Sequence, residues 1–556
     1  MGGPRTGAET PAIASPAAGA AGTGERENLT GARRRWGAPG AYLLAGALLF
    51  VAYLRLSATS QLNSDSANIL LMGSDLLHGH LLLPGWYMSD VSFYPTELPQ
   101  YALLESFLGL KMQTAHVAAA MTYTLVFLLA ILLARSGARG RPAWVRTLAA
   151  AAIMLAPQLG VGVFALDLSV GHIGTSVPLL LLWLLLDKAP PRAYVPIVTT
   201  IVLAWVLMAD QIVYVVGIVP LSLACAARVI RGVAGGTGPW AARIAGQWYE
   251  LSLGAAAVLA AGLAWLANLL IRSAGGFTMS KLPFYFVGPG HLRHNAPAAW
   301  KVLQIFGADY AGLGGVPLVL AFLHLASVIA VAAALLLAAW RFLRPISLVD
   351  QVLAVGIVAN VALFLLTNAA DLAAHEVAVT VPYGAALAAR LLVPAIRVKP
   401  AAERARAGWL RTAAMATGIV ALAGYTAGFG WELTRPSVPP ASISLAAWLE
   451  EHHLTYGLSG YWISSSVTVD SGQRAKVRPL MQYTLKRDLW MARADWYDPG
   501  LHDANFIVLD SQPGFMHHWE PRALIQKYFG TPARTYRTGP YTIMVWDRNL
   551  LESVPR

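Results

Sequence analysis

A polar but aromatic-rich stretch between Gln61 and Tyr101 sets the organisation of the chain; it reads QLNSDSANILLMGSDLLHGHLLLPGWYMSDVSFYPTELPQY. It follows the first long apolar segment, and it is too polar to cross a membrane yet too apolar to be an ordinary linker. Acidic residues and histidines are interleaved in it with tryptophan, tyrosine and phenylalanine. We expect this loop to be the chemical centre, and most of the remaining chain to be a membrane frame that holds it.

The composition identifies the frame as membrane-embedded. The 556 residues are 56% hydrophobic and only 13% charged, with a mean hydropathy of +0.53, whereas soluble globular chains carry about 25% charged residues. A net charge of +12 would suggest nucleic acid in a soluble protein. Here the basic residues are placed as in the cytoplasmic loops of a membrane protein, so we expect membrane lipids and no nucleic acid as partners. Cys225, the only cysteine, excludes an intrachain disulfide.

Apolar segments long enough to cross a bilayer recur about eleven times along the chain. They cover approximately residues 38–57, 114–134, 147–166, 170–187, 194–209, 211–227, 251–271, 312–339, 352–368, 378–396 and 412–431. The sequence therefore predicts a polytopic α-helical membrane protein.

The distribution of Lys and Arg predicts the orientation, because cytoplasmic loops are enriched in both. With the N-terminus inside, the cytoplasmic loops hold sixteen such residues: Arg135, Arg139, Arg141, Arg146, Lys188, Arg192, Arg228, Arg231, Arg243, Arg341, Arg344, Arg397, Lys399, Arg404, Arg406 and Arg411. The outer loops before the tail hold six: Arg55, Lys111, Arg272, Lys281, Arg293 and Lys301. An odd number of spans then places the C-terminal tail outside the cell membrane.

Three regions follow from these patterns. Residues 1–36 are predicted to be a disordered cytoplasmic tail, because they are rich in Gly, Ala, Pro and Thr. Residues 37–434 form the transmembrane module, with 58–112 as the first outer loop. Residues 435–556 have ordinary polarity and predict a soluble α/β domain, with helices at 444–453 and 521–529 and strands at 455–462, 475–480, 505–510 and 541–547.

Asp65 is the candidate catalytic residue of the first outer loop. It opens a helical pattern whose apolar side carries Ile69, Leu70 and Met72. The simpler interpretation is a helix cap, since an acid at a helix N-terminus stabilises it by about 0.5–1 kcal/mol. The functional interpretation is a carboxylate at headgroup level that takes a proton from a hydroxyl. The two are compatible, because a cap would fix the position of the carboxylate.

Other polar residues are predicted to reach the same outer surface and to contact substrate. Within the first loop these are Asp90 and Glu97, where Pro95 and Pro99 argue against a helix. In later outer turns they are Asp167, His172, Asp210, His375 and Glu376. Each alone could be a solvated residue that ends a span. Charged groups at membrane depth are costly unless they are paired or functional, so together they predict a polar outer cavity.

Cations and metals complete the candidate groups. Arg293 and Arg390 are favoured as the cations that hold a lipid phosphate, since the forked guanidinium suits phosphate; snorkelling or pairing with an acid is the alternative. His78 and His80 lack a third ligand at fixed spacing, so they predict no metal site. The inner loops are short and carry no phosphate-binding glycine motif. Any chemistry is therefore expected at the outer face, where soluble nucleotide donors are absent.

The whole plan resembles the GT-C superfamily of membrane glycosyltransferases. The resemblance rests on an N-in polytopic frame, on the motifs NSDSANILLMGSDLLHGH and SDVSFYPTELPQY in the first outer loop, and on a soluble α/β domain after the last span. Protein O-mannosyltransferases, aminoarabinose transferases and mycobacterial arabinosyl- and mannosyltransferases share this plan.

The resemblance implies an inverting enzyme that moves a sugar from a polyprenyl-phosphate donor to a glycan, lipid or protein acceptor of the cell envelope. Asp65 would be the general base on the acceptor hydroxyl. A cation must stabilise the negative charge of the leaving lipid phosphate. Because Arg can do this, no metal is expected to be obligatory, although a divalent cation is possible. The alternatives are a transporter or flippase of lipid-linked sugars and a non-enzymatic scaffold whose tail binds glycan.

Overall fold

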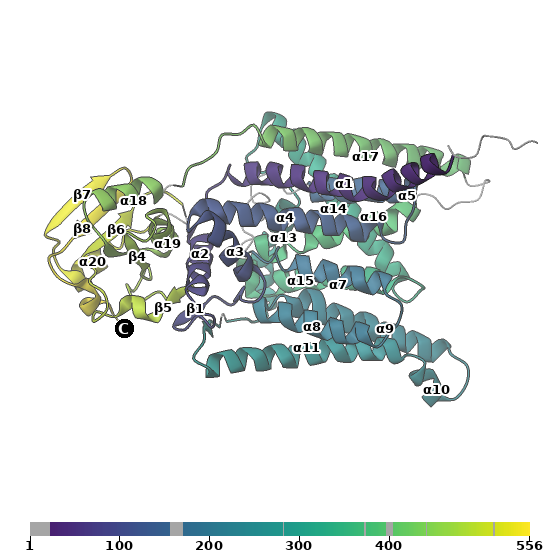
Figure 1. The fold of residues 1–556 in the computed structure, drawn as a ribbon, viewed down its shortest axis with the longest axis horizontal. Helices are drawn as coiled ribbons and strands as arrows, with labels where there is room; N and C mark the ends of the chain where they lie inside the picture. The colour runs from purple at the N-terminus through teal and green to yellow at the C-terminus, as the bar shows by residue number, and fades with distance from the viewer. Residues whose placement is uncertain are drawn as a thin grey trace, which may run out of the picture. The chain divides into compact units, whose positions relative to one another are not determined.

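The computed structural model describes residues 23–155, 171–281, 283–371, 374–395, 404–440, 442–514 and 518–555. The chain divides into two compact units, Met1–Leu49 and Phe50–Arg556. The first contains most of helix α1 (Thr23–Ser57), and the second contains every later element (Figure 1). The finer division predicted from composition, after residues 36 and 434, stays a prediction.

Each predicted apolar segment falls on a helix within the described residues; residues 156–166 of the third segment, 170 of the fourth and 396 of the tenth lie outside them. These helices are α1, α4 (Met112–Arg135), α5 (Arg141–Met154), α7 (Ser176–Lys188), α8 (Tyr194–Ala209), the π-turn η1 (Tyr214–Ile218) continuing as α9 (Val219–Gly235), α11 (Trp248–Ser273), α14 (Gly315–Arg341), α15 (Leu348–Leu366), α16 (Thr380–Ala395) and α17 (Arg404–Glu432). Within the described ranges, seven helical segments are long and apolar enough to cross a membrane. The predicted polytopic helical fold is confirmed, whereas the eleven crossings stay a prediction.

Burial separates central from peripheral helices. The most apolar window of α4 is 72% buried and that of Ala374–Pro394 is 89% buried, whereas that of α11 is only 22% buried. Helix α11 packs beside α8 (Figure 1) and exposes Leu259, Trp265 and Leu266. Large apolar side chains on an outer helix are what a lipid environment allows, since lipid tails are as apolar as leucine.

The first outer loop folds into α2 (Ser64–Leu77), β1 (Trp86–Met88) and α3 (Glu97–Leu108). The predicted apolar side of α2 is confirmed, because Ile69, Leu70 and Met72 are buried. The expectation of no helix near Glu97 is wrong. Helix α3 begins at Glu97 and carries Pro99 in its first turn, where the missing proline N–H costs no helical hydrogen bond.

Short elements connect the remaining membrane helices. They are α10 (Trp240–Ala245), β2 (Thr278–Met279), α12 (Pro289–Asn295), α13 (Ala298–Ile305) and the 3₁₀ turns η2 (Asn368–Asp371) and η3 (Ala374–Val377). Turn η3 leads directly into α16, so the residues of η3 lie at the N-terminal end of a mostly buried helix.

The C-terminal region forms the predicted α/β domain. Its elements are α18 (Ser442–Glu451), β3 (Tyr456–Ser459), α19 (Tyr461–Asp470), β4 (Lys476–Pro479), β5 (Ala492–Arg493), η5 (Ala494–Tyr497), β6 (Phe506–Asp510), α20 (Arg522–Phe529), β7 (Arg534–Thr538), β8 (Tyr541–Val545) and η6 (Leu550–Ser553). The main sheet has the order β4-β3-β6-β8-β7, with β3 parallel to β4 and β6, and β8 antiparallel to β6 and β7. Helix α19 replaces the predicted end of the first tail strand, because β3 stops at Ser459.

A second, small sheet joins three segments that are distant in sequence. Strand β1 of the first outer loop pairs in parallel with β2 and antiparallel with β5 of the tail. One apolar core is also shared, since Leu70 of α2 belongs to the same buried cluster as Leu458 and Ile507 of the main sheet. The C-terminal domain is therefore docked on the loop that carries Asp65.

Candidate active site

Asp65 lies in the first turn of α2, but it is not the helix cap. The side chain of Asn63 fills that role, because its Oδ1 accepts a hydrogen bond from the Asp65 N–H at 3.0 Å. The capping interpretation of Asp65 is therefore corrected. Its carboxylate remains available for another partner, while the cap on the preceding turn still fixes its position.

The partner of the Asp65 carboxylate comes from the C-terminal domain. The Tyr461 hydroxyl, at the start of α19, donates to Asp65 Oδ1 at 2.5 Å, and Asn68 Nδ2 donates to the Tyr461 hydroxyl at 3.3 Å. Burial raises the pKa of Asp65, and the hydrogen bonds from Tyr461 and Asn63 oppose that rise. A carboxylate with a raised pKa is a stronger base than a solvated aspartate, provided that it stays ionised at the working pH.

A cavity of about 290 Å³ opens beside this pair. Its wall is formed by Gly460, Tyr461, Trp462, Ile463, Leu480, Gln482, Asp488, Trp490, His518 and Trp519. Tyr461 thus belongs to both features: it is part of the cavity wall, and its hydroxyl binds Asp65. Aromatic faces combined with an amide and a carboxylate form a surface that suits a polyhydroxylated ligand.

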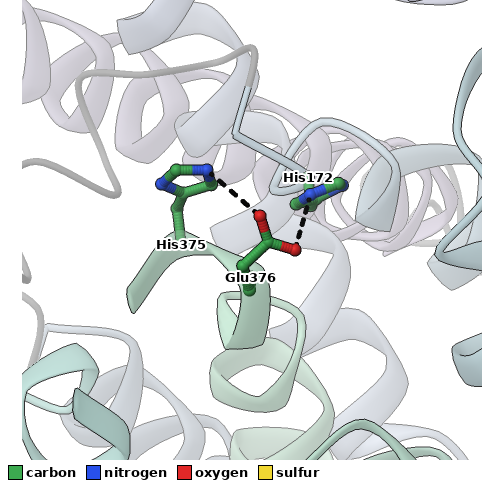
Figure 2. A group of neighbouring side chains, drawn as sticks. All are labelled: His172, His375 and Glu376. Atoms are coloured by element: carbon green, nitrogen blue, oxygen red, sulfur yellow. Dashed lines mark ion pairs between the residues drawn. The ribbon is translucent and has the colours of Figure 1, made fainter. Parts of the chain in front are cut away.

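A second group gathers the polar residues of the outer turns. His172 lies in the turn before α7 with a left-handed backbone (φ 63°). Its Nδ1 contacts Asp210 Oδ2 at 2.8 Å, and its Nε2 lies 3.3 Å from Glu376 Oε2. The His375 Nε2 lies 3.6 Å from the other oxygen of Glu376, so this carboxylate stands between the two imidazoles (Figure 2).

Asp210, the residue directly after α8, is itself held in place by hydrogen bonds. It accepts hydrogen bonds from the Thr175 hydroxyl at 2.6 Å and from the Ile212 N–H at 3.0 Å. Burial lowers the pKa of His172, but the carboxylates of Asp210 and Glu376 outweigh it and raise that pKa well above its usual range. His172 therefore carries a proton on each nitrogen when only these carboxylates surround it.

Asp90 and Glu97 extend this group. Burial raises the pKa of Asp90, and His172, Glu376 and Asp210 all act on it electrostatically. Burial also raises the pKa of Glu97 to about 7, although the Thr96 hydroxyl donates a hydrogen bond to its carboxylate. The loop of His172 approaches Glu97 so closely that a Cβ at Gly174 would overlap the Glu97 carboxylate. The structure thus assembles six of the nine predicted substrate-contacting residues.

The other three predicted residues do not join the group. Asp167 lies outside the described residues. Arg293 is exposed on α12, and the structure records no ion pair between it and a described acid. Arg390 requires a correction: its guanidinium contacts Asp187 at 2.7 Å and Asp350, and it donates to the Leu133 carbonyl at 3.1 Å.

The position of Arg390 explains this correction. It lies ten residues beyond Thr380, the start of α16, and therefore about 15 Å along the helix from the end that carries Glu376. Its partners Asp187 and Asp350 satisfy its charge among segments predicted to be cytoplasmic. A buried arginine with two carboxylates is paired structurally, and it is not a free cation at the outer surface.

Sequence reasoning missed the residues that orient the acids. Tyr461 and Thr175 donate hydrogen bonds to the carboxylates of Asp65 and Asp210, and Asn63 caps the helix turn that carries Asp65. The aromatic density of the tail was the only signal for Tyr461. Among the aromatic residues of the tail, Tyr456, Trp496 and Tyr497 are buried in the core, whereas Tyr461, Trp462 and Trp490 are partly exposed.

Neither a protein-family model nor a curated protein matches the sequence. Solved structures match by fold. ArnT from Cupriavidus metallidurans bound to undecaprenyl phosphate is 13% identical, with a TM-score of 0.52 over 91% of this chain and 98% of that chain. ArnT in the apo state is 11% identical, with a TM-score of 0.54 over 94% and 100%. At this identity the likeness concerns the fold alone: the chain shares the fold of ArnT, an aminoarabinose transferase of the kind that the sequence was found to resemble.

Proposed function

We propose that this multi-pass membrane protein is an inverting glycosyltransferase that uses a polyprenyl-phosphate sugar at the outer face of the cytoplasmic membrane. The observation that carries the proposal is the Asp65 carboxylate, positioned by Tyr461 beside an aromatic cavity. The ArnT-like fold supports it, because one of the matching structures is described as bound to undecaprenyl phosphate. The likeness in fold to ArnT thus supports the proposed lipid partner, and the local contacts of Asp65 support its proposed role as the general base.

The transfer is a single displacement at the anomeric carbon. The acceptor hydroxyl attacks the carbon from the face opposite the phosphate, while Asp65 takes the hydroxyl proton. The bond between the anomeric carbon and the phosphate oxygen breaks, and the lipid phosphate leaves with the electron pair. The anomeric centre is inverted, and Asp65 later releases its proton to water. The raised pKa of Asp65 suits this role, because a base works best when its pKa lies near the working pH.

We assign the aromatic cavity to a glycan acceptor. Trp462 and Trp490 are half-buried residues of the cavity wall, and Gln482 and Asp488 supply hydrogen-bonding groups. Burial raises the pKa of Asp488, and the Trp490 N–H donates a hydrogen bond to its carboxylate. Rings stack against the apolar faces of sugars, and polar groups at the edge orient the hydroxyls. A sugar in this cavity would lie against Tyr461 and hence next to Asp65.

The donor phosphate needs a cation as it leaves. Arg293 remains the proposed cation, since Arg390 is occupied by Asp187 and Asp350. We propose that phosphate departure itself requires no metal, because a monophosphate can be met by a guanidinium. The basic-loop asymmetry supports an N-in orientation with the C-terminal domain outside.

Reconstitution tests the proposal. The purified chain in liposomes is supplied with radiolabelled polyprenyl-phosphate sugars and with a glycolipid extract of the cell envelope as acceptor. A glycosyltransferase releases free lipid phosphate and labels the acceptor, and the release depends on acceptor concentration. Movement of intact donor across the bilayer without product would indicate a transporter. Acceptor binding without either event would indicate a scaffold.

A further inference from the structure

We propose that His172, His375 and Glu376 form a binding site for a divalent transition-metal ion, with Zn²⁺ as the natural occupant. This centre is separate from Asp65, and it does not depend on the proposed transfer reaction. The proposal rests on the spacing of the donor atoms, on the group that orients His172 and on the charge of the surrounding residues.

The spacing of the donor atoms fits a zinc ion. Zn²⁺ binds imidazole nitrogen and carboxylate oxygen at about 2.0–2.2 Å in tetrahedral geometry, which places neighbouring ligand atoms about 3.3–3.5 Å apart. The His172 Nε2 lies 3.3 Å from one Glu376 oxygen, and the His375 Nε2 lies 3.6 Å from the other. One donor atom from each of the three residues can be chosen so that all lie within 4.8 Å of one another. Small side-chain rotations therefore suffice to converge on one ion (Figure 2).

The orientation of His172 provides the second observation. Histidines that bind metal through one nitrogen usually donate the other N–H to a carboxylate, which fixes the tautomer and the ring. His172 does this with Asp210 at 2.8 Å, and Asp210 is fixed in turn by Thr175 and by the Ile212 N–H. The Nε2 is consequently directed toward Glu376. A metal ion would bind at Nε2 and leave the contact between Nδ1 and Asp210 intact.

The local charge provides the third observation. Two carboxylates contact the two imidazoles in a largely buried space: Asp210 lies 2.8 Å from His172, and Glu376 lies 3.3 Å from His172 and 3.6 Å from His375. Buried excess charge is costly, and a dication would offset it. The donor set also selects the ion: two imidazoles and one carboxylate favour Zn²⁺, Co²⁺ or Ni²⁺, whereas Mg²⁺ and Ca²⁺ prefer oxygen ligands. Three protein ligands leave a fourth position for water or an anionic oxygen.

Metal binding is measured on the full chain in detergent after chelator treatment. The chain is titrated with Zn²⁺ and with Co²⁺, whose visible absorption reports tetrahedral nitrogen and oxygen ligation. We expect one ion per chain, a rise in the unfolding temperature with Zn²⁺, and about 100-fold weaker binding in His375→Asn and Glu376→Gln. Asp210→Asn should weaken binding by about 10- to 100-fold, because it acts only through the orientation of His172.

His452→Ala is the matched control. His452 is an exposed histidine of the tail that stacks on Trp448, and its removal should leave metal affinity unchanged. The proposal is overturned if the wild-type chain binds no more Zn²⁺ than Glu376→Gln, or if the control loses binding to the same extent. Glu376→Gln is nearly isosteric, so it still tests the proposal if a histidine variant does not fold. If the folded wild-type chain binds no metal, His172 only forms ion pairs with Asp210 and Glu376.

Discussion

Tyr461 and Asp65 are separated by 396 residues, yet the Tyr461 hydroxyl donates a 2.5 Å hydrogen bond to Oδ1 of the Asp65 carboxylate. The bond connects the first outer loop to the C-terminal domain at the point where catalysis is proposed. Tyr461 also belongs to the wall of the aromatic cavity, so the residue that binds the proposed base borders the proposed acceptor site.

Tyr461→Phe should separate these two roles. The ring remains, but the hydrogen bond that stabilises ionised Asp65 is lost, so the pKa of Asp65 rises further. We expect transfer to fall about 10- to 150-fold near neutral pH, since one hydrogen bond to a charged group is worth about 1.5–3 kcal/mol. The limb of the pH–rate profile that reports deprotonation of the base should move to higher pH. Tyr456→Phe, which removes a buried hydroxyl bonded to the Trp496 carbonyl, should leave the profile in place.

Arg493→Ala should loosen the C-terminal domain from the first outer loop. Its guanidinium contacts Asp75 at 2.7 Å, and the same Asp75 oxygen accepts a hydrogen bond from Trp86 Nε1 at 2.7 Å. We expect a loss of about 1–2 kcal/mol and faster proteolysis between the domains, because the pair is half-buried and bonded to more than one group.

Arg474→Ala is the control for that experiment. The Arg474–Glu450 pair lies within the tail, and the arginine side chain is 70% exposed, so its loss should cost less than about 1 kcal/mol. Equal proteolysis of the two variants would show that the Arg493–Asp75 contact does not hold the domains together.

Glu105→Gln should make the protein less sensitive to rising pH. Burial raises the pKa of Glu105 to about 7, and a hydrogen bond with Ser74 opposes that shift only in part. The folded chain therefore keeps a proton that the unfolded chain releases near its usual pKa, and stability falls as pH rises between about 4.5 and 7. The full penalty is on the order of 3 kcal/mol.

Thermal unfolding in detergent at a series of pH values from 5 to 8 checks this prediction. The wild-type unfolding temperature should fall with pH, and the variant should show a shallower fall. Some slope should remain, since Glu97 also has a pKa of about 7. Parallel curves for the two proteins would mean that Glu105 ionises normally.

Arg390→Met tests the structural assignment of that arginine. Removing the guanidinium leaves Asp187 and Asp350 without their cation in a buried position, and breaking a buried pair costs about 3–5 kcal/mol. We expect poor expression or a much lower unfolding temperature. The double variant that also carries Asp350→Asn should recover part of the loss. A stable Arg390→Met protein with weak donor binding would instead restore Arg390 as a phosphate ligand.

The sequence predicted the elements of the site better than their contacts. Asp65 and α2 were predictable because the apolar positions recur at helical spacing after an acid. The alternation of the predicted spans across the membrane places His172, Asp210 and Glu376 in turns on the same outer side. The fold brings these three residues into contact. Which of these side chains contact each other depends on their geometry, and the spacing of residues along the sequence does not determine it.

The errors have equally local causes. Pro99 argued against a helix but occupies the first turn of α3, where it is tolerated. Arg390 was interpreted as an outer cation because Asp187 and Asp350, which neutralise it, are distant in sequence. Helix α19 was missed because Tyr461–Asp470 contains the β-branched residues Ile463, Val467 and Thr468, whose weak strand preference is overridden by packing.

The most direct test of the proposed base is Asp65→Asn in the purified, reconstituted protein. Asn keeps the size of the side chain and can still bind the Tyr461 hydroxyl, so folding and thermal stability should stay close to the wild type. It cannot accept the acceptor proton, so we predict a loss of transfer of about 100-fold or more from a polyprenyl-phosphate sugar. A stable Asp65→Asn protein that turns over at the wild-type rate would contradict the role assigned to Asp65.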